Sequence, residues 1–144
     1  MSRIKIDLPS SFSFHTSIEI RITDINYGGH VGNDTVLSII HEARMRFLYD
    51  KGYAELDIGG SGLIMSDVAI VFKAELFYGE TVRISVKATD FSKVGFDVYY
   101  LLEKQLEGKT INVATAKTGM LCYDYGKKKI TSIPEKFIQS FKVD

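Results

Sequence analysis

The chain has few of the residues that form disulfides or metal clusters, and it has no long apolar run. Its 144 residues include one cysteine, three histidines, two prolines and no tryptophan. The single cysteine, Cys122, excludes an intramolecular disulfide and favours a reducing compartment, so we expect a cytoplasmic protein. No apolar run reaches the roughly 20 residues of a membrane-spanning helix. The first residues also lack the apolar core of a secretory signal.

Neither sign of charge is in excess, because 18 basic residues balance 18 acidic ones. Binding of nucleic acid through bulk charge needs a basic excess, so that class of function is excluded. The three histidines are scattered and form no His-x-x-x-His pair, so we expect no metal site. The glycine clusters lack the lysine and the spacing of a phosphate-binding loop, and no cofactor is expected. The length fits one domain, residues 1–144.

The pattern of apolar residues predicts one long helix among antiparallel strands. Isoleucines alternate with polar residues at 18–23, which predicts a half-buried strand. Apolar residues recur at helical spacing over 34–51, and Asn33 or Asp34 is the expected cap. Runs rich in Ile, Val, Phe and Tyr, joined by short turns, predict strands at 63–76, 81–91, 96–105 and 110–125. A proline opens a predicted short helix at 134–141.

The junction between the first strand and the helix is the most informative segment. Residues 24–33 read DINYGGHVGN, which combines a carboxylate, amides, an imidazole and glycines. Acyl-transfer chemistry uses polar side chains beside free backbone N–H groups, and a strand-to-helix junction supplies both. The segment is therefore either a functional site or a tight turn.

Three motifs in order resemble the 4-hydroxybenzoyl-CoA thioesterase family, near its long-chain acyl-CoA and acyl-carrier-protein thioesterase branches. The first is Asp-x-Asn-x-x-Gly-His-Val-x-Asn at 24–33, followed by Glu-Ala-Arg at 42–44. The second is IVFKAELFYGE at 70–80, which is similar to the family's second strand and turn. Residues 122–135 resemble its last strand and closing proline, so the resemblance covers about 18–141.

The resemblance implies an α+β hotdog fold, in which a five- to six-stranded antiparallel sheet wraps one long central helix. It implies hydrolysis of an acyl thioester of coenzyme A or an acyl-carrier protein to a free acid and a thiol. Family members pair their helices and join their sheets, so a homodimer or homotetramer is expected. Two alternatives stay open, a non-catalytic acyl-CoA-binding protein and a hotdog enoyl-thioester hydratase or dehydratase.

The resemblance also assigns candidate catalytic residues. His30 matches the family's functional histidine and would activate water or orient the carbonyl; otherwise it braces the loop. Many family members have an aspartate where this chain has Asn26, whose amide has no basic form, so Asn26 either positions water or closes an Asx-turn. Glu42 and Glu75 are assisting candidates. The alternatives are a surface ion pair with Arg46 for Glu42 and a solvent-facing position for Glu75.

Further candidates concern substrate binding. The groups expected to hold the oxyanion or position the substrate are Gly29, Val31 and Asn33, because glycine permits close approach and a helix N-terminus favours negative charge. Ser92 and Lys93 lie in a turn where family members place basic residues for coenzyme A phosphates. The alternative for Lys93 is an exposed turn lysine. The glycine-rich loop at 54–62 is expected to be mobile and to influence acyl chain length.

Overall fold

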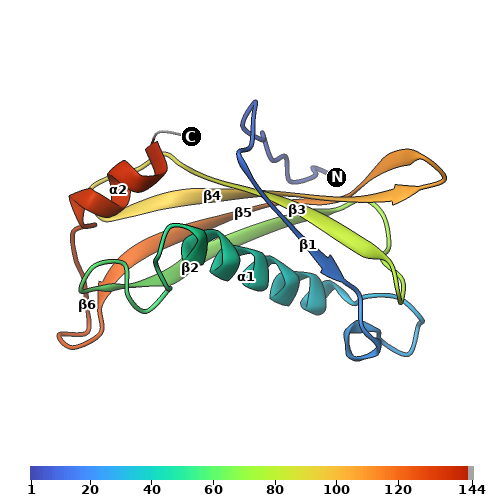
Figure 1. Ribbon diagram of the computed structural model, residues 1–144, viewed down its shortest axis with the longest axis horizontal. Coiled ribbons are helices and arrows are strands. Elements are labelled where there is room, and N and C mark those ends of the chain that lie inside the picture. Colours follow the sequence, from blue (N-terminus) through green and yellow to red (C-terminus); the bar gives the residue numbers. More distant parts are fainter. Residues whose placement is uncertain (143–144) are drawn as a thin grey trace.

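The computed structural model describes residues 1–142 and shows one long helix against a curved antiparallel sheet (Figure 1). The last two residues of the expected domain lie outside this range. In chain order the elements are β1 (Phe14–Glu19), a 3-10 turn (Ile22–Asp24), α1 (Asn33–Asp50), β2 (Gly62–Phe72), β3 (Thr81–Thr89), β4 (Gly95–Leu106), β5 (Lys109–Asp124), β6 (Lys129–Ile130) and α2 (Glu135–Lys142). The sheet order is β1-β3-β4-β5-β2, with β6 beside β5. The expected α+β hotdog arrangement is confirmed.

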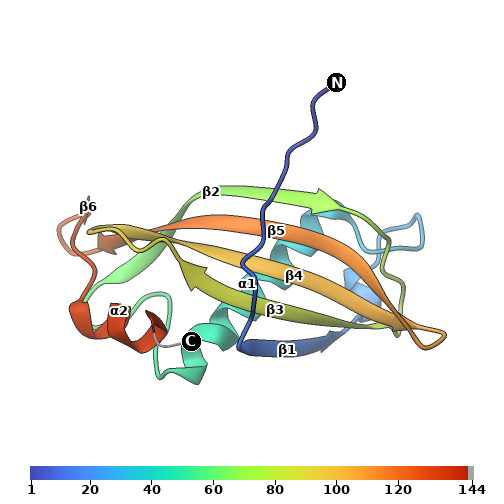
Figure 2. The same ribbon diagram turned by 90° about the horizontal axis from the view of Figure 1, so that it is seen from above.

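The hydrophobic core lies between α1 and the inner face of the sheet, which covers the helix when seen from above (Figure 2). Every second residue of a strand points to the same face. The buried side chains of β4 follow this rule and are those of Phe96, Val98, Tyr100, Leu102 and Lys104. From the helix, the buried apolar residues are Val36, Ile39, Ile40, Ala43, Phe47 and Leu48. A lysine thus continues the apolar series at the end of β4.

Helix α2 closes one end of this core through aromatic contacts. The ring centroid of Phe137 lies 5.5 Å from that of Phe96 and 4.9 Å from that of Tyr53. The ring of Phe141 lies 4.9 Å from that of Phe47, near the C-terminal end of α1. Figure 1 shows α2 at this end, whereas the first turn of α1 lies at the other end of the sheet. No helix within residues 1–142 is both long and apolar enough to cross a membrane.

The start of the chain differs from the expectation in two places. The first strand spans Phe14–Glu19 instead of 18–23, because its pairing with β3 ends where Glu19 meets Thr81, the first residue of that strand. The chain then turns, and the carboxylate of Asp24 accepts the N–H of Arg21 at 2.8 Å. The prediction that Asn33 or Asp34 caps the helix was also wrong, since Gly32 occupies the N-cap position and no side chain caps α1.

The glycine-rich loop after α1 is tied to the core by a buried polar network. Arg44 donates to the carboxylate of Glu55 at 2.6 Å and to the hydroxyl of Tyr100 at 3.2 Å. Tyr100 in turn lies 2.7 Å from the hydroxyl of Thr118. Ile58, at the centre of the loop, is fully buried. Glu55 and Ile58 therefore anchor the loop to the core, and its expected mobility and influence on acyl chain length stay predictions.

Candidate active site

The loop that carries His30 is a compact turn closed by its own backbone. The N–H of Asn26 donates to the carbonyl of His30 at 3.0 Å, and the N–H of Gly29 donates to the carbonyl of Asn26 at 3.0 Å. Gly29 adopts a φ of +89°, which side chains other than glycine rarely tolerate. The turn projects the imidazole of His30 toward the start of α1.

The segment after β2 lies beside this loop. β2 ends at Phe72, and the chain then runs in irregular conformation to Thr81, where β3 begins. The N–H of Val31 donates to the carbonyl of Leu76 at 2.9 Å, which joins the two segments. Glu75 precedes Leu76 and His30 precedes Val31, so this bond brings both candidate side chains to one place.

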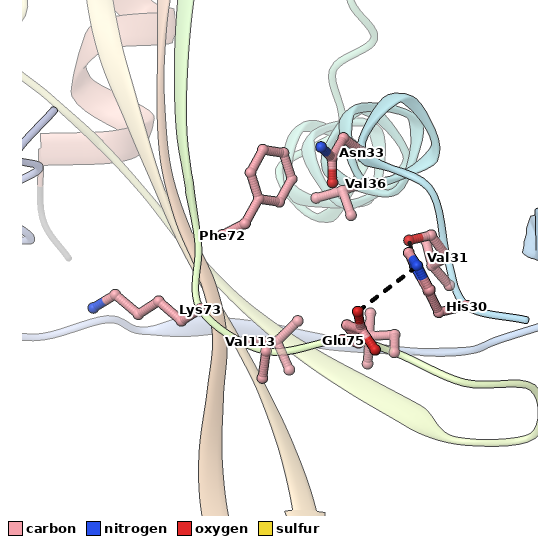
Figure 3. Close-up of a pocket in the computed structure, with 10 residues that line it drawn as sticks. His30, Val31, Asn33, Val36, Phe72, Lys73, Glu75 and Val113 are labelled. Carbon is pink, nitrogen blue, oxygen red and sulfur yellow. Dashed lines mark hydrogen bonds and ion pairs between the residues drawn. The ribbon is translucent and has the colours of Figure 1, made fainter. Parts of the chain in front are cut away.

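His30 and Glu75 face each other at a cavity of about 250 Å³ (Figure 3). The imidazole Nε2 lies 3.7 Å from the carboxylate Oε1. The histidine side chain is 31% exposed and the glutamate side chain 60%, so both reach solvent. The apolar part of the lining comes from Val31, Val36, Phe72, Ala74, Leu76 and Val113. An acid–base pair thus borders a largely apolar hollow at the helix start.

The second ring nitrogen of His30 determines which tautomer the loop favours. Nδ1 lies 3.0 Å from the backbone carbonyl of Val31. A carbonyl only accepts hydrogen bonds, so Nδ1 carries the proton and donates it. In the neutral ring, Nε2 then keeps its lone pair and faces Glu75. The Nε2 lone pair therefore borders the cavity, where it can accept a hydrogen bond or a proton from a bound molecule.

Asn26 holds the turn through its side chain. Its Oδ1 accepts the N–H of Gly28 at 2.9 Å, which is an Asx-turn. A Cβ at Gly28 would lie 3.1 Å from this oxygen and 3.7 Å from Nε2 of His30, so the amide and the imidazole share one side of the loop. The structure shows the turn-forming interaction that was one of two open alternatives, and Asn26 does not line the cavity.

The three groups expected at the oxyanion have different environments. The N–H of Gly29 and that of Val31 donate within the fold, to Asn26 and to Leu76 respectively. Both donors are therefore engaged in this structure. Asn33, the first residue of α1, does line the cavity, and the first turn of a helix leaves its N–H groups without intrahelical partners.

Glu42 lies apart from this cavity. It lines a separate groove of about 460 Å³ between β1 and α1, together with Ser38 and Arg46. Arg46 donates to its carboxylate at 2.8 Å and also to the hydroxyl of Thr16 at 2.8 Å. The surface ion pair considered for Glu42 is present, and one copy of the chain does not bring Glu42 to His30.

Ser92 and Lys93 are also distant from His30 within one copy. Ser92 closes its turn, since its hydroxyl donates to the carbonyl of Gly95 and accepts the N–H of the same residue. Across the sheet, Gly95 is level with Ile64 in β2, whereas Phe72 at the cavity is eight residues further along that strand. A bulge in β2 takes up one of these residues, so the two positions are seven residues apart on β5, which is about 23 Å at about 3.3 Å per residue.

Several residues around the cavity were not singled out from the sequence. Phe72 projects toward the cavity, whereas Lys73 directs its ammonium away from His30 and Glu75 (Figure 3). Lys104 holds the segment that carries Glu75, by donating to the carbonyl of Glu75 at 2.7 Å. A signal for Lys104 existed, namely a lysine in the inward register of an apolar strand. Among residues 1–142, no cluster of His, Cys, Asp and Glu side chains is arranged to hold a metal ion.

Comparisons with known proteins agree on the fold. The model of the thioesterase-like superfamily matches residues 20–141. No curated protein matches the chain. A 1,4-dihydroxy-2-naphthoyl-CoA thioesterase from Synechocystis is 20% identical with a TM-score of 0.79, over 89% of this chain and 94% of its own.

Two further solved structures are similar. A mutant of 4-hydroxybenzoyl-CoA thioesterase in complex with 4-hydroxybenzoyl-CoA has a TM-score of 0.83 at 14% identity, over 92% of this chain and 100% of its own. A hypothetical protein from Aquifex aeolicus has a TM-score of 0.80 at 23% identity, over 90% of this chain and 100% of its own. At these identities the structural likeness establishes the fold, and the family match covers most of the length. The chain therefore belongs to the thioesterase-like superfamily.

Proposed function

We propose that this protein hydrolyses an acyl thioester, carried by coenzyme A or an acyl-carrier protein, to a free acid and a thiol. The observation that carries the proposal is the pair of His30 Nε2 and Glu75 Oε1, 3.7 Å apart at a largely apolar cavity. Two of the solved structures above are named as thioesterases of aromatic acyl-CoA esters. Their names support an acyl thioester as the substrate.

In the proposed reaction, water attacks the thioester carbonyl carbon while Nε2 of His30 takes a proton from the water. The Glu75 carboxylate lies 3.7 Å from that nitrogen and balances the positive charge that develops on the ring. The carbonyl oxygen becomes an oxyanion, for which Asn33 at the start of α1 is the proposed partner. The C–S bond then breaks, and the imidazolium returns its proton to the departing thiolate.

The oligomer expected for this family forms part of the proposal. β2 is an edge strand that pairs only with β5 among residues 1–142, and its exposed apolar residues are Met65, Val68 and Phe72. An unpaired apolar edge is a template for another strand. Antiparallel pairing of two β2 strands brings the Gly62 end of one copy beside the Phe72 end of the other. In that dimer the Ser92 and Lys93 turn of one copy approaches the cavity of its partner, which gives Lys93 access to coenzyme A phosphates.

The first experiment is thiol release from a panel of acyl-CoA esters, from acetyl to palmitoyl together with benzoyl and hydroxybenzoyl, with His30→Gln beside the wild type. We expect turnover of at least one ester and its loss in the variant. Turnover that survives the substitution would remove His30 from the proposal. An absence of turnover on every ester, and on acyl-carrier-protein esters, would refute hydrolysis.

A binding protein without turnover is the second candidate function, and one observation favours it. Asn26 stands where many family members have an acid, and its oxygen already accepts the N–H of Gly28. Calorimetric titration with acyl-CoA distinguishes the two functions, because a binder gives saturation without thiol release. We also propose a cytoplasmic location, which fits either function. The single cysteine, Cys122, is a free buried thiol, as is usual in a reducing compartment.

A further inference from the structure

The segment that carries Glu75 is held by a buried lysine from a neighbouring strand. The ammonium of Lys104 donates to the backbone carbonyl of Glu75 at 2.7 Å and to both carboxylate oxygens of Glu80, at 3.0 and 3.1 Å. The Lys104 side chain is 6% exposed. A buried ammonium is costly unless it is paired and hydrogen-bonded, so its partners determine where the segment can lie.

Glu80 completes the clamp from the other end of the same segment. Its Oε1 accepts the N–H of Phe77 at 2.7 Å, so the carboxylate binds the segment at one point and Lys104 at another. The Lys104 ammonium also lies 5.2 Å from the centroid of the Phe77 ring. The backbone from Glu75 to Glu80 is therefore fixed through a charged pair, in a region without regular secondary structure.

The position of this clamp relative to His30 suggests a role beyond packing. The carbonyl that Lys104 holds belongs to the same residue whose carboxylate faces His30 at 3.7 Å. The next carbonyl along, that of Leu76, holds the His30 loop through the N–H of Val31. Because the Glu75 side chain is largely exposed, its backbone is the part of the residue that the fold controls.

We propose that Lys104 is a positioning residue, which sets the distance between the Glu75 carboxylate and His30 by holding the main-chain carbonyl of Glu75. This inference rests on the proposed hydrolysis. Glu80 neutralises the ammonium, so Lys104 acts through geometry, and it does not touch the substrate. Misplacement of a catalytic group by about 1 Å can cost about a hundredfold in rate.

The test is a double-mutant cycle on an ester that the wild type hydrolyses. Lys104→Met removes the donor and keeps an unbranched side chain of similar length. The partly buried Glu80 carboxylate would then lack its partner. A second form, Lys104→Met with Glu80→Gln, therefore keeps an acceptor for Phe77 without the charge. Glu80→Gln alone and Lys117→Met are the controls. Lys117 pairs with Asp97 at 3.3 Å on the same sheet, so its removal reports on the loss of an ion pair in general.

We expect both forms of the Lys104 variant to lower kcat by about ten- to hundredfold with KM changed by less than about twofold. In a Glu75→Gln background the same change should have less than about a twofold effect, since the residue that it positions is already inactive. Circular dichroism would confirm that each variant is folded. Equal losses in both backgrounds, or a loss matched by Lys117→Met, would overturn the positioning role while hydrolysis stands. A wild type that releases no thiol would overturn both.

Discussion

The backbone N–H of Val31 donates to the carbonyl of Leu76 at 2.9 Å, and this bond joins the two segments that carry the candidate catalytic side chains. His30 and Glu75 each precede one of the bonded residues. A main-chain hydrogen bond thus holds the backbones of His30 and Glu75 side by side, and their side chains meet at the cavity. The site is built where the start of α1 meets the segment that follows β2.

Replacement of His30 by glutamine should abolish most hydrolysis. Glutamine approximates the size of the ring but has no basic form, and general-base catalysis contributes about a hundred- to ten-thousandfold. We expect kcat/KM to fall by at least about a hundredfold on the best ester, measured as thiol release. His15→Gln is the matched control, because His15 pairs with the hydroxyl of Ser85 and does not line the cavity. Equal losses in both variants would contradict the assignment.

Substitutions at Asn26 test whether its side chain stabilises the turn. Asn26→Ala loses the acceptor for the N–H of Gly28 and should reduce the free energy of unfolding by about 1 kcal/mol. Asn26→Asp keeps that acceptor and should change stability by less than about 0.5 kcal/mol. Urea unfolding measures both. If Asn26→Asp were as destabilising as Asn26→Ala, the hydrogen bond would not be what holds the turn.

Tyr100→Phe should destabilise the protein, most strongly at neutral pH. The phenol joins Arg44 to Thr118, and loss of a buried partner costs about 1–3 kcal/mol. Burial raises the pKa of Tyr100, more than the nearby Arg44 guanidinium lowers it. The tyrosine of the unfolded chain ionises at about pH 10, while the native Tyr100 keeps its proton. The free energy of unfolding of the wild type therefore falls above about pH 10.

Phenylalanine does not titrate, and the difference between Tyr100→Phe and the wild type should therefore shrink above about pH 10. Urea unfolding at pH 7, 9 and 10.5 measures this difference. A difference that stays constant with pH would show that the Tyr100 phenol has the same proton affinity in the native and unfolded chains.

A charge on the outer edge of β2 should prevent self-association. Val68 is 39% exposed on this strand, and Val68→Lys places an ammonium where a second copy would pair. We expect light scattering to show a dimer for the wild type and a monomer for the variant. Leu106→Lys, at the end of β4, alters another exposed apolar residue away from β2 and should leave the dimer intact. A monomeric wild type would refute the proposed pairing.

Much of the fold could be predicted because it depends on local periodicity. The helical spacing predicted α1 to within a residue at each end, and the strand runs separated by glycine turns predicted β2 to β5 with modest errors at their ends. The first strand was misplaced, since isoleucine alternation continues to Ile22 although pairing with β3 stops at Glu19. The short β6 was not singled out, because its two residues pair through the backbone of Tyr123 and Asp124.

The candidate site could be predicted in part, because resemblance singles out residues and not their distances. It placed His30 and Glu75 among the candidates, and the structure brings these two together. It also named Glu42, which faces a different groove, and Lys93, which lies at the far end of the sheet. In the dimer proposed above, which pairs two β2 strands, Lys93 of one copy would approach the cavity of its partner.

The pattern of apolar residues was enough to predict that one apolar helix packs against an antiparallel sheet, because the periods of 3.6 and 2 residues fix which side chains can be buried together. Three relations became visible in the folded molecule alone: His30 faces Glu75, the N–H of Val31 is engaged with Leu76, and Lys104 holds the Glu75 segment. Each of these relations joins residues far apart in the chain, through an ion pair or through one hydrogen bond. Local patterns do not record them, because each depends on the register of strands and on the path of an irregular loop.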